Sequence, residues 1–238
     1  IAQTSEQFSS EFKGFSAIAD TANMRITLAN WEAKYPTDAE LFTGYFNYYF
    51  RLAKKEIVVL GTNQPKGESI VIKDSTSKTA GFMGSEIYYD SVLVRKGFEK
   101  IDQGIALYPN RLDMRFGKIY VLGLLQNYEL FTQEIINTVA FSSTNKNEWT
   151  WTNNEKKEDG ESFLLESMQN YQMQLYNTGR DDLLFNMRQI AEEILKYHPK
   201  HLVSLANIGL TYLIVGLYDE ALASMLKAEE INPKDHVV

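Results

Sequence analysis

The sequence contains no cysteine, and this absence excludes several kinds of chemistry at once. Without thiols there is no disulfide framework, no zinc site built on thiolates and no cysteine nucleophile. Three histidines are present, and two of them, His198 and His201, flank Pro199 without the spacing of a metal-binding helix. We therefore expect no metal site.

Basic residues and long apolar runs are also scarce. The chain has 24 Lys and Arg against 31 Asp and Glu, a formal net charge of -7 at pH 7. This excess of negative charge disfavours nucleic acids and anionic membranes as partners. A membrane-spanning helix needs roughly 18 consecutive apolar residues, and the best run, at 56–60, is far shorter. We expect neither nucleic-acid binding nor membrane insertion.

The sequence motifs of common enzymes are missing too. There is no G-x-S-x-G elbow, no G-x-G-x-x-G loop and no calcium-binding loop. The segment 61–67, GTNQPKG, places its lysine before the second glycine, unlike a phosphate-binding loop. The sequence predicts a protein without enzymatic activity or cofactor. Chemistry that uses only carboxylates is a third hypothesis, behind two binding functions.

What the chain does have is a helical hairpin pattern over 202–233. Small residues at regular spacing let two helices approach closely, and a proline ends the second helix because it has no N–H. The residues that carry this pattern are Gly209, Tyr212, Gly216, Ala221, Ala228 and Pro233. Their spacing resembles the tetratricopeptide repeat (TPR), whose period is about 34 residues. A single hairpin cannot bury its apolar face alone, so we expect neighbouring hairpins.

A second copy of the pattern stands earlier in the chain. The spacings of 4, 3 and 5 residues are shared by two sets, Gly97, Ile101, Gly104 and Pro109 in one and Ala221, Met225, Ala228 and Pro233 in the other. Matched small residues and terminal prolines so far apart indicate an internal repeat.

Helical periodicity covers most of the remaining sequence. We predict helices over 5–34, 39–59, 86–108, 110–141 with a turn near Gln126 and Asn127, 161–178, 181–198 and 202–231. Two polar insertions interrupt them, 61–85, with a short strand or hairpin at 68–73, and 142–160. The resemblance implies an all-α, right-handed αα superhelix, a TPR-like solenoid of about nine helices. We expect one array over 1–238, with a further repeat or cap after it.

In TPR proteins the first helix of each hairpin lines a concave groove that binds partner peptides or helices. Carried over to the last hairpin, the groove residues are Val203, Ala206, Leu210 and Leu213. After Pro109 two registers are open. One register places Phe116 and Tyr120 in the groove. The other register turns a basic stripe towards it, formed by Arg111, Arg115 and Lys118, whose alternative interpretation is an ordinary solvated face.

The leading hypothesis is therefore a non-enzymatic scaffold that binds a peptide or helix of another protein. A second hypothesis is a small-ligand or glycan site formed by the tyrosine-rich helix at 42–50 and by Trp149 and Trp151. The alternation of these two tryptophans also fits a loop anchor, with one ring packed inward and the other exposed. The chain begins at Ile1, which favours an exported location, in the periplasm or at the surface of a bacterium, over the cytoplasm.

Overall fold

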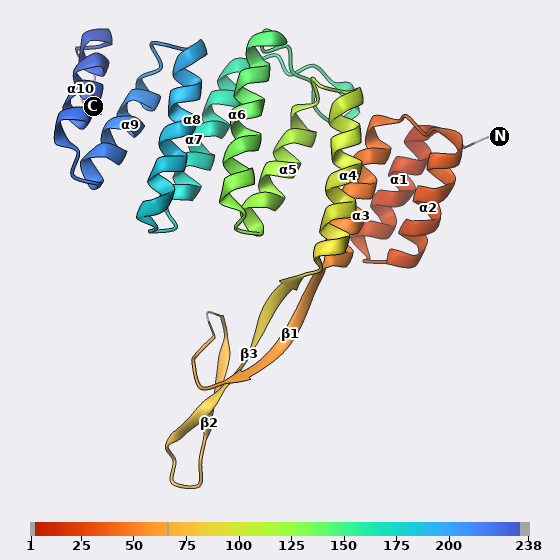
Figure 1. The fold of residues 1–238 in the computed structure, drawn as a ribbon. Helices are drawn as coiled ribbons and strands as arrows, with labels where there is room; N and C mark the ends of the chain where they lie inside the picture. The colour runs from red at the N-terminus through yellow and green to blue at the C-terminus, as the bar shows by residue number, and fades with distance from the viewer. Residues whose placement is uncertain (1–2, 66, 234–238) are drawn as a thin grey trace. The chain divides into compact units, whose positions relative to one another are not determined.

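The structure, a computed structural model, describes residues 3–65 and 67–233. It divides into two compact units, Ile1–Tyr108 and Pro109–Val238, and each is described by itself. The described residues form ten α-helices, where the sequence predicted about nine, and these pair into helical hairpins (Figure 1). The prediction of one continuous array stays a prediction. None of the helices in the described ranges has the length and apolarity to cross a membrane.

Unit 1 contains two helical hairpins and a sheet. Its helices are α1 (Ser5–Ala17), α2 (Thr21–Lys34), α3 (Ala39–Ala53) and α4 (Ser91–Leu107). Each begins at a polar cap: Thr4 and Gln7 form a capping box on α1, and aspartates accept from the first turns of the other three. The predicted segment 5–34 is thus two helices.

The core of unit 1 is aromatic and joins α1, α2 and α3. It contains Phe8, Phe12, Met24, Leu28, Trp31, Leu41, Tyr45 and Tyr48. Trp31 is buried, and its indole Nε1 donates to Asp38 Oδ2 at 3.2 Å. Asp38 also caps α3. The same carboxylate therefore fixes the start of α3 against the core residue of α2.

An antiparallel sheet connects α3 to α4 and is larger than the predicted insertion. Its strands are β1 (Lys54–Gly61), β2 (Ser69–Lys73) and β3 (Thr79–Tyr89), in the order β1-β3-β2. The short strand predicted at 68–73 is confirmed as β2. The sheet extends from the ends of α3 and α4 (Figure 1).

Two predicted helix boundaries next to the sheet were wrong. The helix predicted to reach residue 59 ends at Ala53, and the helix predicted from Glu86 begins at Ser91. The run Ile57–Leu60 is apolar and mostly β-branched, so it prefers a strand once β3 is available to pair with it. Ala53 accepts from the backbone N–H of Asp90 at 2.9 Å, which closes the sheet at the helix ends.

Unit 2 continues with three hairpins. The helices are α5 (Leu112–Leu124), α6 (Tyr128–Thr144), α7 (Gly160–Tyr176), α8 (Leu184–Tyr197), α9 (Leu202–Ile214) and α10 (Tyr218–Ile231). The turn predicted near Gln126 is confirmed, and Gln126 has a positive φ of 56°. First helices contact first helices: α5 meets α7 through Phe116 and Tyr171, and α7 meets α9 through Gln169 and Asn207.

The small residues lie where helices cross closely, as the internal repeat predicted. A Cβ on Gly209 would stand 3.0 Å from Met225 Cγ, so α9 and α10 are in direct contact there. Ala221 and Ala228 are buried on the facing side of α10. Gly97 and Gly104 are buried in α4 at the corresponding positions, where a Cβ on Gly97 would meet Phe46 of α3. Both hairpins use the same packing.

Candidate functional site

A groove of about 400 Å³ lies between α1 and α3, the first helices of the two hairpins in unit 1. Phe12, Trp31 and Gly44 give it an apolar floor. Polar and charged side chains form its walls, namely Ser9, Lys13, Ser16, Glu40, Thr43, Asn47 and Arg51. The groove thus combines an apolar base with several hydrogen-bonding groups, as binding sites for ligands do.

Positive charge gathers at one end of this groove. Lys13 lies near the end of α1, Arg51 lies in the last turn of α3, and both are exposed. The Arg51 guanidinium Nη2 donates to Ser16 Oγ at 3.2 Å. Within the described residues, neither cation forms an ion pair with a carboxylate. The oxygen Thr43 Oγ1, farther along the wall, is buried without a hydrogen-bond partner. The two exposed cations, Lys13 and Arg51, are available to a ligand.

A second groove, of about 510 Å³, lies between α7 and α9 in unit 2. Its lining consists of Ser162, Leu165, Glu166, Gln169, Asn170, His201 and Val203. Beneath it, Asn207 Nδ2 donates to Gln169 Oε1 at 2.6 Å and to Gln172 Oε1 at 3.2 Å. This amide network connects the two helices that form the groove.

The six predicted groove residues differ in how exposed their side chains are. Val203 is 41% exposed and lines the α7–α9 groove. On the same helix, Ala206 and Leu210 are half-buried and Leu213 is exposed. Tyr120 is exposed on α5, whereas Phe116 is buried against the rings of Trp151, Phe163 and Tyr171. Their role in binding stays a prediction.

The basic stripe does not form the exposed face that its spacing indicated. Arg111 is 1% exposed and forms a bidentate pair with Asp113, at 2.8 Å for both bonds. Arg115 is 7% exposed, and its guanidinium lies 4.6 Å from the ring centroid of Phe141. Burial lowers the pKa of Arg115 from its usual value. Lys118 is half-buried and pairs with Glu134 at 3.0 Å. These cations stabilise unit 2 internally.

The insertion at 142–160 folds onto unit 2 through its tryptophans. Trp149 is 0% exposed and packs against Phe141, with ring centroids 5.8 Å apart. Trp151 is half-buried and contacts Phe116 and Phe163. Both rings anchor the loop, the second less completely than the first. Asn154 of the short 3-10 helix Thr152–Asn154 accepts from Arg111 and links the loop to α5.

The tyrosine-rich helix at 42–50 is likewise part of the core. Tyr45 and Tyr48 are buried in α3. The Tyr45 hydroxyl donates to Glu32 Oε2 at 2.6 Å, and Lys100 Nζ contacts the other oxygen at 2.7 Å. The hydrogen bonds that Glu32 accepts from Lys100 and Tyr45 lower the pKa of its carboxyl. Burial, and the bond that its hydroxyl donates to Glu32, raise the pKa of Tyr45. This triad joins α2, α3 and α4.

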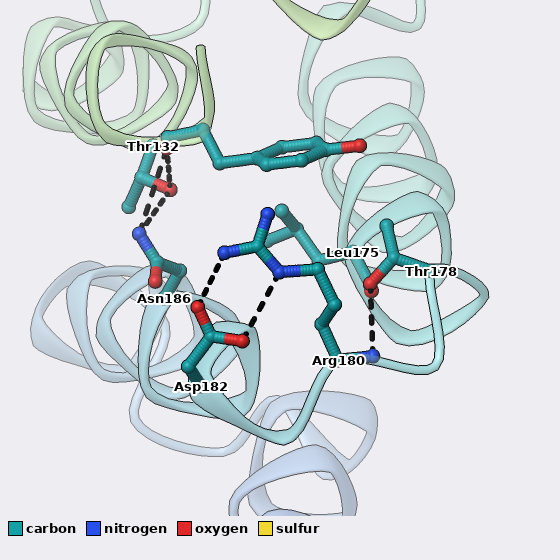
Figure 2. Close-up of polar contacts among 7 residues, drawn as sticks. Thr132, Leu175, Thr178, Arg180, Asp182 and Asn186 are labelled. Atoms are coloured by element: carbon teal, nitrogen blue, oxygen red, sulfur yellow. Dashed lines mark hydrogen bonds and ion pairs between the residues drawn. The ribbon is translucent and has the colours of Figure 1, made fainter. Parts of the chain in front are cut away.

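A polar cluster joins the turn after α7 to α6 and α8 (Figure 2). Arg180 forms a bidentate pair with Asp182, and its guanidinium lies 5.8 Å from the ring centroid of Tyr128. The bond from Arg180 lowers the pKa of Asp182. Asn186 Nδ2 donates to Thr132 Oγ1 at 3.0 Å. Together these contacts position the α7–α8 turn. No group of three His, Asp or Glu side chains in the described ranges is placed to hold a metal ion.

We expect His201 to make the stability of unit 2 depend on pH. Its Nδ1 lies 2.8 Å from Ser204 Oγ, and burial, with a smaller effect of His198, lowers its pKa below 6.5. The unfolded chain therefore binds this proton at higher pH than the folded chain. We expect the contribution of His201 to stability to be complete above about pH 6.5 and to be lost as the pH falls through the folded pKa.

Thermal unfolding at pH 7.5 and pH 5 measures this effect. The melting temperature of the wild-type chain should be lower at pH 5 than at pH 7.5. For His201→Gln the difference should be smaller, because glutamine takes up no proton. An equal fall in both proteins would rule out His201 as the source.

Three solved structures align with nearly the whole chain at low sequence identity. YrrB, described as a TPR protein with an unusual peptide-binding site, is 13% identical with a TM-score of 0.42, over 98% of this chain and 89% of that chain. MamA is 12% identical with a TM-score of 0.42, over 97% and 92%. PilW, described as a widely conserved type IV pilus biogenesis factor, is 9% identical with a TM-score of 0.43, over 97% and 79%. Likeness at this level says nothing about function. No protein-family model and no curated protein matches the sequence.

The α1–α3 groove was not predicted from the sequence. Asn47 and Arg51 are four residues apart on α3, so they share a face, and this spacing was a usable signal. Lys13 comes from a different helix, and only the packing of α1 on α3 brings it to the same groove.

Proposed function

We propose that the chain is a non-enzymatic interaction scaffold that binds an extended, acidic segment of another protein in the α1–α3 groove. The observation that carries this proposal is the pair of cations, Lys13 and Arg51, at one end of a groove with an apolar floor. A carboxylate of the partner would gain charge-assisted hydrogen bonds from them at little desolvation cost, since both cations are exposed. The exposed amide of Asn47 would bind main-chain groups of the segment.

The α7–α9 groove of unit 2 offers a second surface for an extended segment, without the cations of the first groove. Val203 and Leu165 offer apolar surface there, and the neighbouring Gln169 and Asn170 offer amide groups. Of the remaining predicted residues, the exposed Leu213 and Tyr120 and the half-buried Ala206 and Leu210 belong to this proposal. Phe116 is buried and does not belong to it. An exported location also stays a prediction.

In the described part of the chain, the aromatic rings named in the rival hypothesis of a ligand pocket pack mainly against other side chains. The rings of Trp151, Phe116, Phe163 and Tyr171 contact one another. Trp149 and Tyr45 are buried. These rings fill the interior and leave the α1–α3 groove as the better candidate.

Charge reversal in the groove tests the proposal. A panel of fluorescent acidic peptides is titrated with the wild-type chain, and binding is followed by fluorescence anisotropy. We expect Lys13→Glu and Arg51→Glu each to weaken binding roughly ten- to hundredfold, because a hydrogen bond to a charged group contributes about 1.5–3 kcal/mol. High salt should weaken binding as well.

The matched control is Lys96→Glu. Lys96 is exposed on α4 and lies outside the groove lining, so the same change of net charge there should leave the affinity unchanged. Binding that responds equally to all three substitutions, or no binding of any peptide in the panel, contradicts the proposal.

A further inference from the structure

Two buried amides beneath the α7–α9 groove have orientations that the main chain fixes. Gln172 is 1% exposed, and its Nε2 donates to the main-chain oxygen of Met168 at 3.4 Å. Because a carbonyl oxygen can only accept, the Nε2 group must lie on this side and the Oε1 atom of Gln172 on the other. Asn207 is 6% exposed, and its Nδ2 donates to that Oε1 atom at 3.2 Å. The Nδ2 group of Asn207 therefore faces α7.

The same reasoning extends to Gln169, which lines the groove. The Nδ2 group of Asn207 also donates to Gln169 Oε1, at 2.6 Å. If the Gln169 amide were turned round, its Nε2 group would face the Nδ2 group of Asn207, donor against donor. The oxygen of Gln169 is thus held by a buried neighbour, and its N–H groups are left for the groove. At this position the groove offers a hydrogen-bond donor.

The described lining of the groove holds one full charge at pH 7.5, the carboxylate of Glu166. His201, also in the lining, is uncharged at that pH because burial lowers its pKa from the usual value. Glu166 is exposed, and no Lys, Arg or His in residues 3–65 and 67–233 lies within ion-pair distance of it. Glu161, earlier on α7, differs, since its Oε1 lies 3.3 Å from His198 Nδ1. The groove therefore carries an unbalanced negative charge.

The α7 side of the groove forms one continuous face along the helix. Its residues are spaced three or one apart, and they are Ser162, Leu165, Glu166, Gln169 and Asn170. This face spans about 12 Å at 1.5 Å per residue, which is the length of about four residues of an extended chain. Glu166 and Gln169 are about 4.5 Å apart along the axis. An extended segment can therefore place a carbonyl at one and a neighbouring side chain at the other.

We propose that the α7–α9 groove binds an extended segment of another protein whose lysine or arginine pairs with Glu166, while a main-chain carbonyl of the segment accepts from Gln169 Nε2. Leu165 and Val203 of the lining contact the aliphatic stem of the cationic side chain. The inference rests on the proposed function only in taking this groove as a binding surface. Its ligand has the opposite charge to the acidic segment of the α1–α3 groove, so the two grooves select different sequences.

Matched peptide pairs test the role of Glu166 by fluorescence anisotropy. The two labelled peptides of a pair, roughly eight residues long, differ at one position, which is lysine in one and glutamine in the other. The wild-type chain should bind the lysine peptide roughly two- to fivefold more tightly, as expected for an exposed ion pair. Glu166→Lys should reverse this preference. Glu192→Lys is the matched control, because Glu192 is exposed on α8 outside the lining, and it should keep the preference.

Gln169→Met tests the oriented amide with the same peptides. Methionine has a similar length but no N–H donor, so both peptides should bind roughly two- to tenfold more weakly, with the preference for lysine unchanged. Asn207 keeps its bond to Gln172, and the variant should therefore remain folded, which its melting temperature shows. Gln103→Met, at an exposed position of α4, is the control and should leave both affinities unchanged.

The result is independent of the α1–α3 groove. Lys13→Glu and Arg51→Glu should leave the preference for lysine unchanged, because neither residue lines the α7–α9 groove, so failure of one groove is distinguishable from failure of the other. A preference that survives Glu166→Lys, or that Glu192→Lys also abolishes, would overturn the proposal. The same holds for a folded Gln169→Met chain with wild-type affinities, and for lysine peptides that do not bind at all.

Discussion

The Trp149→Ala variant should lose about 3–5 kcal/mol of its free energy of unfolding, because a fully buried large aromatic ring leaves a cavity when it is removed. Trp149 is 0% exposed and packs between Phe141 and the start of α7, where a Cβ on Gly160 would lie 3.1 Å from its ring. The loss should appear as a lower midpoint of urea denaturation. The whole 142–160 loop depends on this anchor.

Trp149→Phe is the matched control. The Trp149 Nε1–H group is buried without a hydrogen-bond partner, and such a group costs about 1–3 kcal/mol. Phenylalanine keeps much of the ring volume and removes this unpaired donor, so its variant should lose far less stability than the alanine variant. Equal losses in the two variants would mean that the ring does not act through packing.

Arg111→Met should be as destabilising, at about 3–5 kcal/mol, since it breaks a buried ion pair by removing one partner. The Asp113 side chain is 12% exposed and accepts two hydrogen bonds from the Arg111 guanidinium. Without these two hydrogen bonds, the Asp113 carboxylate stays largely out of water and has lost the charge that balances it. The same urea denaturation measures the loss.

The double variant Arg111→Met with Asp113→Leu provides the control, because replacing both partners by apolar groups is often neutral. Most of the lost stability should return in it. If the double variant is no more stable than Arg111→Met, the loss comes from other contacts of the arginine, such as its bond to Asn154.

The helical hairpins could be predicted because their signals are local. Gly209, Ala221 and Ala228 mark a close helix crossing, and the spacing repeats at Gly97 and Gly104, so pattern alone located two hairpins. The first and last residues of the sheet could not be predicted from such local signals. Residues 54–61 of β1 pair with residues 82–89 of β3. A strand is stable only when its partner is in place. Ile57–Leu60 fits either state until that pairing is known.

Predicting the candidate site from the sequence would have required knowledge of the tertiary packing even more than predicting the sheet. Arg111, Arg115 and Lys118 share a helix face by spacing, but spacing does not show whether the face points outward, and the partners that bury it come from the 142–160 loop and from α6. Lys13 and Arg51 are ordinary surface cations in the sequence. Only the packing of α1 beside α3 brings them to one groove.

Mapping the bound peptide by nuclear magnetic resonance tests the central claim most directly. A peptide that binds in the anisotropy panel is added to the isotope-labelled chain, and backbone amide shifts are followed. We predict that the largest shifts fall on Ser9, Lys13, Thr43, Asn47 and Arg51, the polar lining of the α1–α3 groove. Shifts that fall instead on α2 and α4, with the groove unchanged, would contradict the account.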